Sequence, residues 1–261
     1  MNLRPLKRFG QNYLTDPNIL KKIVAEISPR DDDNLIEIGP GKGALTGKLL
    51  ENINSFIAIE IDKRVREELS GKFPNLKLIS GDFLEIDLQK LYSLKKKKLR
   101  VVGNIPYNIT SPILFKMIVN NNLIHDSVLM VQYEVAKRIK GKKGTKDYGI
   151  LSVLLNFFAD VRICFKVTPS SFYPKPKVDS AVIHLFFKEI EIMDEMKSLF
   201  IQVVKASFGN RRKTLKNSLS NSIFGNINFE DSGIDLTKRA EQLDIEDFLK
   251  LSEFLRNYNE K

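Results

Sequence analysis

The sequence is poor in the residues that form disulfides and hold metals. It contains one cysteine, two histidines and no tryptophan. Cys164 cannot form an internal disulfide, and it stands in the apolar run 161–167, where a packed thiol is more common than a reactive one. His125 and His184 lie far apart in the sequence, without the spacing of metal ligands. We therefore expect neither redox chemistry nor a metal site.

Long hydrophobic runs are also absent. No apolar stretch approaches the ~20 residues that a helix needs to cross a bilayer. Residues 1–14 carry basic side chains but no apolar segment followed by a small-residue cleavage site, as a signal peptide would have. We expect a cytoplasmic protein without a membrane span. Its 261 residues suffice for one large domain, or for one with a small appendage.

Charge is unevenly distributed along the chain. There are 42 Lys and Arg residues against 32 Asp and Glu residues. Six basic residues and no acidic one lie between Met196 and Phe229, whereas the stretch from Glu230 onward is net acidic. Segregated charge of this kind suits a long polyanion better than a small acid.

Apolar runs rich in β-forming residues alternate with amphipathic helical stretches through the first part of the chain. This alternation is typical of βαβ units that build a mostly parallel sheet. We expect strands at residues 35–38, 56–59, 76–79, 100–102, 127–131, 161–167 and 181–187. The last two have no helix-length apolar pattern between them, which predicts an antiparallel pair at the sheet edge.

The apolar spacing becomes wholly helical from about Met193. This change predicts a small all-α domain, with the boundary near residues 188–192. The expected organisation is an α/β domain over residues 1–190 and a helical domain over residues 191–261.

A glycine-rich turn follows the first predicted strand. Residues 35–43 form a strand that runs into a tight turn and opens a helix, and Gly39 and Gly41 permit positive φ and close approach of the backbone to a ligand. The next strand ends at Glu60, 21 residues after Gly39, where a carboxylate can accept hydrogen bonds from ribose hydroxyls. The pattern indicates a nucleotide-like ligand and, by itself, also fits a nicotinamide dinucleotide.

The third strand ends in Gly81-Asp82-Phe83. A carboxylate and an aromatic ring at this edge could meet an adenine amino group and ring face. Either Glu60 or Asp82 could instead cap the helix that follows it. Three successive strand ends nevertheless converge on one ligand.

The fourth strand ends in the tetrapeptide Asn104-Ile105-Pro106-Tyr107. The N6 amino group of adenine is a poor nucleophile because its lone pair is delocalised into the ring. Asn104 Oδ1 and the Ile105 carbonyl could accept both amino hydrogens and turn that lone pair toward a methyl donor. Pro106 withholds an amide donor and stiffens the loop, while Tyr107 can stack on the base. The loop therefore predicts an amino-methyltransferase.

Six motifs occur in order along the chain: Phe9–Leu14, Glu37–Gly41, Gly81-Asp82, Asn104–Tyr107, Ser170–Ser180 and Ala206–Leu215. Together they resemble the KsgA/Erm family of ribosomal RNA adenine dimethyltransferases over almost the whole chain. The resemblance implies a Rossmann-like class I methyltransferase domain with a mostly parallel seven-stranded sheet and helices on both faces. It also implies S-adenosylmethionine as the methyl donor.

The same resemblance assigns residues to the site. Asn12 and Leu14 would close over the methionine part of the cofactor, in a segment that otherwise reads as a tail. The rest of the cofactor site would comprise Gly39, Gly41, Glu60, Asp82, Phe83 and Asn104. Phe172, which otherwise reads as a core residue, would cover one face of a flipped adenine and Tyr107 the other. Tyr13 stands where the family usually has phenylalanine, and it keeps an aromatic ring.

The segments Phe172–Ser180 and Phe208–Asn217 resemble the housekeeping branch of the family. That branch dimethylates N6 of two adjacent adenines in the 3′-terminal hairpin of small-subunit (16S) ribosomal RNA, during biogenesis of the 30S subunit. We expect a monomer whose helical domain binds RNA. The candidate RNA contacts are Arg211, Arg212, Lys213, Lys137 and Arg138.

Three alternatives stay open at this point. The other branch of the family methylates an adenine of large-subunit (23S) ribosomal RNA and confers macrolide resistance. A non-catalytic RNA-binding assembly or transcription factor could retain the same fold. An NAD-dependent oxidoreductase would need a proton-relay histidine or a Tyr–Lys pair, and the sequence offers no convincing one.

Overall fold

The computed structural model describes residues 11–259, so Phe9 and Gly10 of the first motif lie outside it. The chain forms two compact units. The first comprises the chain up to residue 136 together with residues 160–188, and the second comprises residues 137–159 and 189–261.

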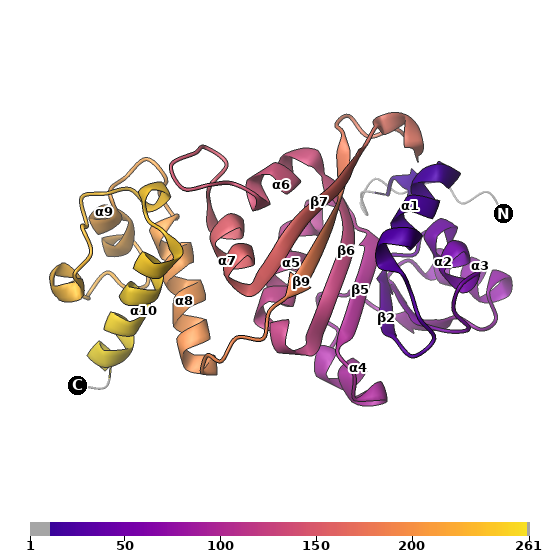
Figure 1. Ribbon diagram of the computed structural model, residues 1–261, viewed down its shortest axis with the longest axis horizontal. Coiled ribbons are helices and arrows are strands. Elements are labelled where there is room, and N and C mark those ends of the chain that lie inside the picture. The colour runs from indigo at the N-terminus through magenta and orange to yellow at the C-terminus, as the bar shows by residue number, and fades with distance from the viewer. Residues whose placement is uncertain (1–10, 260–261) are drawn as a thin grey trace. The chain divides into compact units, whose positions relative to one another are not determined.

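The first unit is built on a seven-stranded sheet (Figure 1). In spatial order its strands are β4 (Lys77–Ser80), β3 (Ile57–Glu60), β2 (Asn34–Ile38), β5 (Leu99–Asn104), β6 (Ile124–Gln132), β9 (Ser180–Phe187) and β7 (Ala159–Val167). Strands β2 to β6 pair in parallel, and β9 runs antiparallel to β6. All seven predicted strands are present, and β7 and β9 are neighbours with β7 at the edge. The predicted α/β fold class is confirmed.

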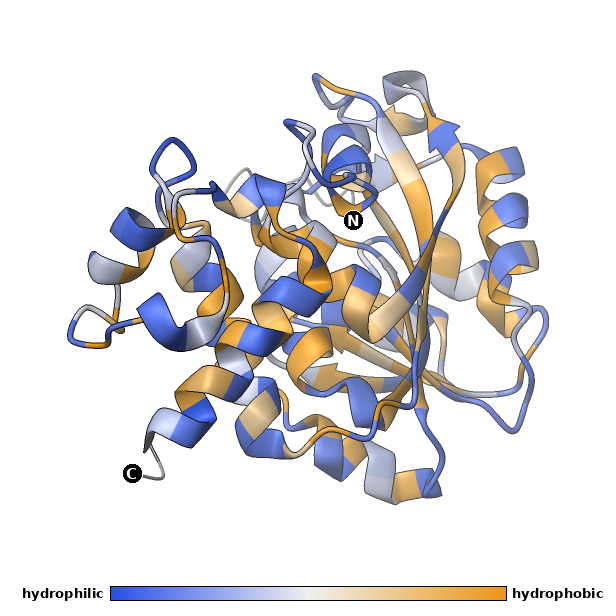
Figure 2. Cartoon of the chain, turned by 60° about the vertical axis from the view of Figure 1, so that its left-hand side comes forward, coloured by the Kyte–Doolittle hydropathy of each residue, from blue (hydrophilic) through white to orange (hydrophobic). Residues whose placement is uncertain are grey.

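Both faces of the sheet are buried. Helices α1 (Pro17–Ile27) and α2 (Ala44–Leu50) share one hydrophobic cluster with Leu35, Val102 and Val128 of the strands. The alternate strand residues, such as Ile36 and Val101, are equally buried on the opposite face. Helices α3 (Lys63–Lys72), α4 (Leu88–Lys95) and α5 (Thr110–Val119) also belong to this unit, and α6 (Tyr133–Ile139) begins in it. Figure 2 shows hydrophobic strands and helices that carry hydrophilic residues on their outer sides.

A second, two-stranded sheet joins distant parts of the chain. β1 (Tyr13–Leu14) pairs antiparallel with β8 (Phe172–Tyr173), with Leu14 opposite Phe172 and Tyr13 opposite Tyr173. We call this pair the β1–β8 ribbon. It was not predicted, because two-residue strands carry no periodicity that a sequence pattern could reveal.

The second unit is helical. Its helices are α7 (Ile150–Phe158), α8 (Asp194–Ser207), α9 (Leu215–Ser220) and α10 (Ile245–Asn259). Aromatic rings fill its core, where Phe158, Phe200 and Phe248 are fully buried. Residues 137–159 are grouped with this unit although they precede β7 in the chain.

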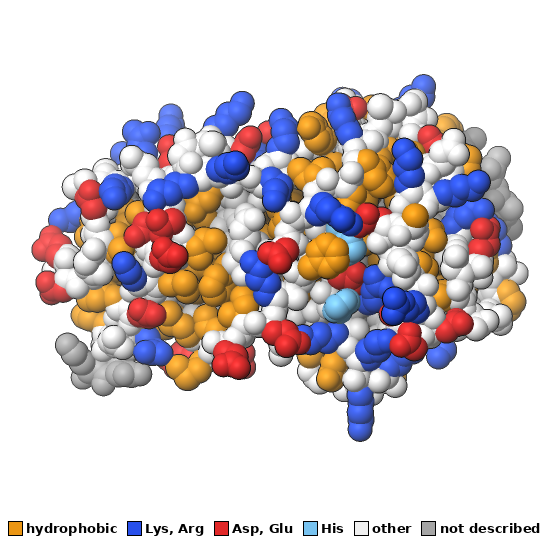
Figure 3. All heavy atoms as spheres, viewed as in Figure 1, with side chains coloured by type: hydrophobic (Ala, Val, Ile, Leu, Met, Phe, Trp, Pro, Cys, Tyr) orange, Lys and Arg blue, Asp and Glu red, His pale blue; other side chains and the backbone are white. Residues whose placement is uncertain are grey.

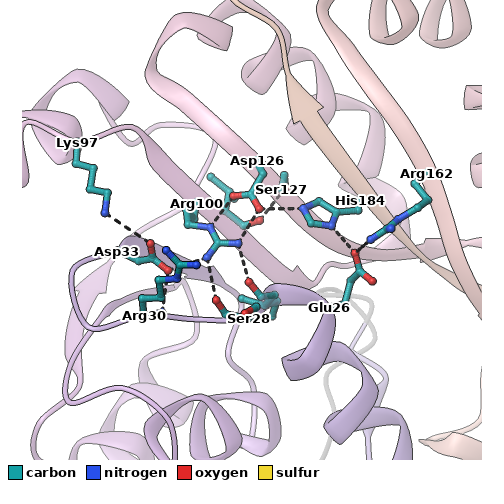
Figure 4. A network of polar contacts seen from close by, with 12 residues as sticks. Glu26, Ser28, Arg30, Asp33, Lys97, Arg100, Asp126, Ser127, Arg162 and His184 are labelled. Atoms are coloured by element: carbon teal, nitrogen blue, oxygen red, sulfur yellow. Dashed lines mark hydrogen bonds and ion pairs between the residues drawn. The ribbon is translucent and has the colours of Figure 1, made fainter.

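A network of charged groups lies near the amino-terminal ends of β5 and β6 (Figure 4). The Arg100 guanidinium donates to both carboxylate oxygens of Asp126 and to Asp33, and its remaining bonds go to backbone carbonyls. His184 lies between Asp126 (Nε2–Oδ2 2.9 Å) and Glu26 (Nδ1–Oε1 2.5 Å). Burial alone would raise the pKa of Asp126, but hydrogen bonds from Arg100 and His184 lower it to about 2.

Candidate active site

A cavity of about 220 Å³ opens at the carboxyl ends of the parallel strands. In open α/β sheets this edge is where ligands bind, because the loops that follow the strands converge there. The predicted site residues that line it are Asn12, Leu14, Gly39, Gly41, Glu60, Asp82, Phe83, Asn104, Ile105, Pro106 and Tyr107. The structure therefore brings together every predicted cofactor and catalytic residue except Phe172.

The glycine turn after β2 exposes bare backbone to the cavity. Gly39 and Gly41 have φ values of +61° and +55°, a region that side chains strain to adopt. A Cβ at Gly41 would also lie 2.9 Å from a ring carbon of Tyr13. The turn thus requires glycine both for its conformation and for the close approach of the Tyr13 ring.

Glu60 ends β3 and is buried beside this turn. Its carboxylate accepts hydrogen bonds from the backbone amides of Gly41 (3.3 Å) and Asp62 (2.9 Å). Burial raises the pKa of Glu60, and the hydrogen bonds from Asp62 and Gly41 oppose that rise. The helix that follows is capped by Asp62, which accepts from the Arg64 amide. The alternative that Glu60 caps α3 is therefore wrong.

Asp82 and Phe83 lie in the turn that follows β4. One carboxylate oxygen of Asp82 accepts from the Leu84 amide at 2.9 Å, so this residue does stabilise its own turn. Phe83 lines the cavity but is almost fully buried. Ile61, by contrast, lines the cavity with about half of its surface exposed, at 48%. Sequence reasoning missed Ile61, although its place directly after the acidic residue of β3 could have indicated it.

The side chain of Asn104 is oriented by the amino-terminal segment. Its Nδ2 donates a hydrogen bond to the backbone carbonyl of Asn12 at 2.8 Å. The donor side of the amide is thereby committed, and Oδ1 is the acceptor that this residue can offer to a ligand.

Tyr107 is fixed at its hydroxyl. The Tyr107 Oη and Ser180 Oγ atoms lie 2.5 Å apart, which ties the loop after β5 to the start of β9. Burial raises the pKa of Tyr107, so the phenol is neutral over the physiological range. The ring is held in place as a neutral aromatic surface.

Phe172 is the one predicted catalytic residue that the structure places elsewhere. Its side chain is 2% exposed and packs in the hydrophobic cluster that also contains Leu14. It does not line the cavity, so the expected sandwich of an adenine between Tyr107 and Phe172 stays a prediction.

The predicted RNA contacts belong to the second unit, whereas the cavity residues belong to the first. Arg211 Nη2 donates to the backbone carbonyls of Lys146 and Tyr148, both at 2.8 Å, so this guanidinium stabilises the local fold. Arg212, Lys213, Lys137 and Arg138 are exposed. Arg211 is exposed as well, and the contact of all five residues with RNA stays a prediction.

No group of three or more His, Cys, Asp or Glu side chains in residues 11–259 is arranged to hold a metal ion. None of the helices in that range is both long and apolar enough to span a membrane.

Comparison with known proteins identifies the family. A family model described as ribosomal RNA adenine dimethylase matches residues 3–257. The chain belongs to this family. Membership confirms the predicted resemblance and the predicted class of enzyme, a methyltransferase, and it excludes the NAD-dependent oxidoreductase.

Individual relatives match nearly the full length of this chain. It is 45% identical over 250 residues to the ribosomal RNA small subunit methyltransferase A of Chlorobium phaeobacteroides (strain BS1), covering 96% of this chain and 93% of the relative. Among solved structures, a dimethyladenosine transferase from Plasmodium falciparum superposes with a TM-score of 0.73 at 29% identity, covering 95% of this chain and 97% of the other. The 23S rRNA methyltransferase ErmE gives 0.63 at 27% identity, covering 94% and 100%.

Proposed function

We propose that this enzyme transfers methyl groups from S-adenosylmethionine to N6 of two adjacent adenines in the 3′-terminal hairpin of small-subunit (16S) ribosomal RNA. The observation that carries the proposal is the orientation of Asn104, whose donor is committed to Asn12 and whose acceptor remains for a ligand beside Tyr107. The relatives at 40–45% identity, named ribosomal RNA small subunit methyltransferase A, support the choice of RNA.

The cavity fits the cofactor. S-Adenosylmethionine supplies an electrophilic methyl group on a sulfonium. Glu60 would accept hydrogen bonds from the ribose hydroxyls, Asp82 would accept one from the adenine amino group through its second oxygen, and the bare backbone at Gly39 and Gly41 leaves room for close approach. Leu14 and the half-exposed Ile61 add apolar surface for the remainder of the molecule.

The tetrapeptide would hold the target base. Asn104 Oδ1 and the Ile105 carbonyl accept the two hydrogens of the adenine amino group, which directs its lone pair toward the methyl donor. Pro106 lacks an N–H that would compete for this position, and Tyr107 stacks on the base. No general base is needed beforehand, because the amino group becomes strongly acidic as it gains the methyl group.

A tritium transfer assay tests the mechanism. We expect Asn104→Ala and Tyr107→Ala each to lower kcat by at least about 100-fold, because both groups act on the reacting base. Binding of S-adenosylhomocysteine to Tyr107→Ala, measured by calorimetry, serves as the control for an intact cofactor site. Unchanged methylation in both variants would contradict the proposed roles.

The RNA target is tested by comparing substrates. We expect methyl transfer to immature small subunits and little to large subunits or free RNA. The structural likeness to ErmE makes large-subunit RNA the second candidate, and preferential methylation of large subunits would establish it instead. We further propose that the enzyme acts as a monomer and in the cytoplasm. Sedimentation of the purified protein would detect any larger assembly.

A further inference from the structure

The segment 173–179, from the end of β8 to the start of β9, carries exposed apolar groups. Tyr173 is 63% exposed and Val178 is 45% exposed. A tyrosine ring this open to water gains little from packing within the chain, and most of its surface is available to a partner.

Both ends of this segment are attached to the walls of the cavity. At the first end, Thr15 donates its backbone amide to the Ser171 carbonyl at 2.8 Å, beside the β1–β8 ribbon. At the other end, the Ser180 hydroxyl bonds the hydroxyl of Tyr107. Residues 173–179 are thus held between the cofactor side of the cavity and the catalytic loop.

The register of the ribbon places Tyr173 next to the cavity. Directly opposed residues of an antiparallel pair project to the same face, and Tyr173 is opposite Tyr13. Tyr13 lines the cavity. In the other pair, Leu14 and Phe172 both lie in the hydrophobic cluster, and Leu14 also reaches the cavity. Tyr173 therefore lies on the Tyr13 side of the ribbon, at the rim of the site.

The segment is also cationic. Lys175 and Lys177 are exposed, and neither forms an ion pair within the described part of the chain. Within the segment the carboxylate of Asp179 is paired with Lys166 at 2.7 Å, and the neighbouring Asp16 accepts a hydrogen bond from Ser171 Oγ. In the view of Figure 3, lysine and arginine side chains gather with hydrophobic ones over the upper ends of β7 and β9.

We propose that Tyr173, Lys175 and Lys177 form a platform for single-stranded RNA at the rim of the active site. The ring of Tyr173 stacks on an unpaired base that flanks the target adenine, and the two lysines contact the adjoining phosphates. The inference rests on the proposed function and adds a second base contact to it. An aromatic ring interleaved with unpaired cations matches a nucleic-acid strand, while two exposed apolar side chains are too little surface for a stable protein interface.

Steady-state methylation of immature small subunits tests the platform. For Tyr173→Ala we expect the KM for RNA to rise about tenfold with kcat nearly unchanged, since one stacked base is lost. Tyr173→Phe keeps the ring and is expected to stay within about twofold of the wild type. Affinity for S-adenosylmethionine, measured by calorimetry, remains unchanged in both. Leu94→Ala on α4 of the first unit, where the leucine is 67% exposed, is the control and leaves the KM unaltered.

The lysines give an independent readout. For the double variant Lys175→Gln, Lys177→Gln we expect the slope of log KM against log salt to become shallower by about 1 to 1.5, because each phosphate contact releases counterions. An unchanged KM in Tyr173→Ala together with an unchanged salt slope in the double variant would overturn the platform while leaving the proposed function intact. Failure of the wild-type enzyme to methylate small subunits would instead remove the proposed function.

Discussion

At the scale of single residues, the carboxyl group of Glu37 has a raised pKa. It lines the cavity from β2, is almost completely buried and accepts a hydrogen bond from Thr46 Oγ1 at 2.7 Å. Burial raises the pKa of its carboxyl to about 8, and the bond from Thr46 only partly opposes this. The side chain is therefore neutral at physiological pH.

The raised pKa of Glu37 makes the free energy of unfolding depend on pH. The unfolded carboxyl ionises near pH 4.5, and the folded one near 8. Glu37 thus contributes its full stabilisation below pH 4.5 and loses it as the pH rises through 8, with a slope of up to about 1.4 kcal/mol per unit. We expect Glu37→Gln, which cannot ionise, to gain stability relative to the wild type between pH 5.5 and 7.5. Urea denaturation at several pH values measures this difference, and parallel profiles would contradict it.

The tetrapeptide shows what sequence can predict at this scale. The roles expected for Asn104 and Tyr107 followed from the chemistry of the adenine amino group, and both residues line the cavity. Their orientation could not be predicted, because it depends on the carbonyl of Asn12 and the hydroxyl of Ser180. These partners are 92 and 73 residues away in the chain, beyond the reach of local patterns.

At the scale of elements, the β1–β8 ribbon connects the core to the cofactor site. Leu14 is buried in the hydrophobic cluster and also lines the cavity, whereas Leu20 of α1 is buried in the same cluster but does not line the cavity. These two leucines separate the packing role of the ribbon from its binding role.

We expect Leu14→Ala and Leu20→Ala to lower the free energy of unfolding by similar amounts, about 2–4 kcal/mol each. Only Leu14→Ala should also weaken cofactor binding, by about 5- to 10-fold, because apolar surface at the cavity is lost. Chemical denaturation and calorimetry with S-adenosylmethionine measure the two effects. Equal loss of affinity in both variants would show that general destabilisation explains the binding defect.

Elements differ in how much of them the sequence reveals. The parallel strands β2, β3, β5 and β6 were predictable because each carries an apolar run that is buried on both faces and ends in a polar loop, whereas β4 at the sheet edge is partly exposed. The ribbon was not, because its pairing joins residues 13–14 to 172–173 with no periodic signal in either segment. The different place of Phe172 has the same cause, since the ribbon turns its side chain toward the core.

At the scale of the whole molecule, the network around Arg100 stabilises the first unit. Asp126 accepts bonds from both Arg100 and His184 (Figure 4). Removing one partner of a buried pair leaves an uncompensated charge, so we expect Asp126→Asn to lower the free energy of unfolding by about 3–5 kcal/mol at pH 7. Chemical denaturation of the wild type and of Asp126→Asn at pH 7 measures this loss of stability.

The pH dependence of the same variant is a second test. The stabilisation from Asp126 is present above pH 3.8, the ordinary pKa of its carboxyl, and is lost as the pH falls through about 2. Asp126→Asn should therefore approach the wild type in stability under acid conditions. Asp32→Asn is the control, because its exposed pair with Lys97 should contribute little. If Asp32→Asn lowered the free energy of unfolding as much as Asp126→Asn, the stabilisation would not be specific to Asp126.

The division of the chain was only partly visible in the sequence. The change to helical spacing near residue 193 coincides with the return of the chain to the second unit at residue 189. Residues 137–159 gave no such signal. Their grouping depends on tertiary contacts such as those of Phe157 and Phe158 with Phe200, which no local pattern encodes.

The hydrogen bonds of Arg100 and Arg211 have a consequence for how the enzyme meets RNA. The formal charge of +10 sets the long-range attraction to a polyanion, which a distant strand senses regardless of internal pairing. Release of condensed ions, however, counts only cations that touch phosphate, and the Arg100 guanidinium and the Nη2 atom of Arg211 are committed to partners within the fold. The charges that speed association with RNA therefore differ from those that contact phosphates in the complex. Ionic strength should accordingly affect the association rate and the lifetime of the complex to different degrees.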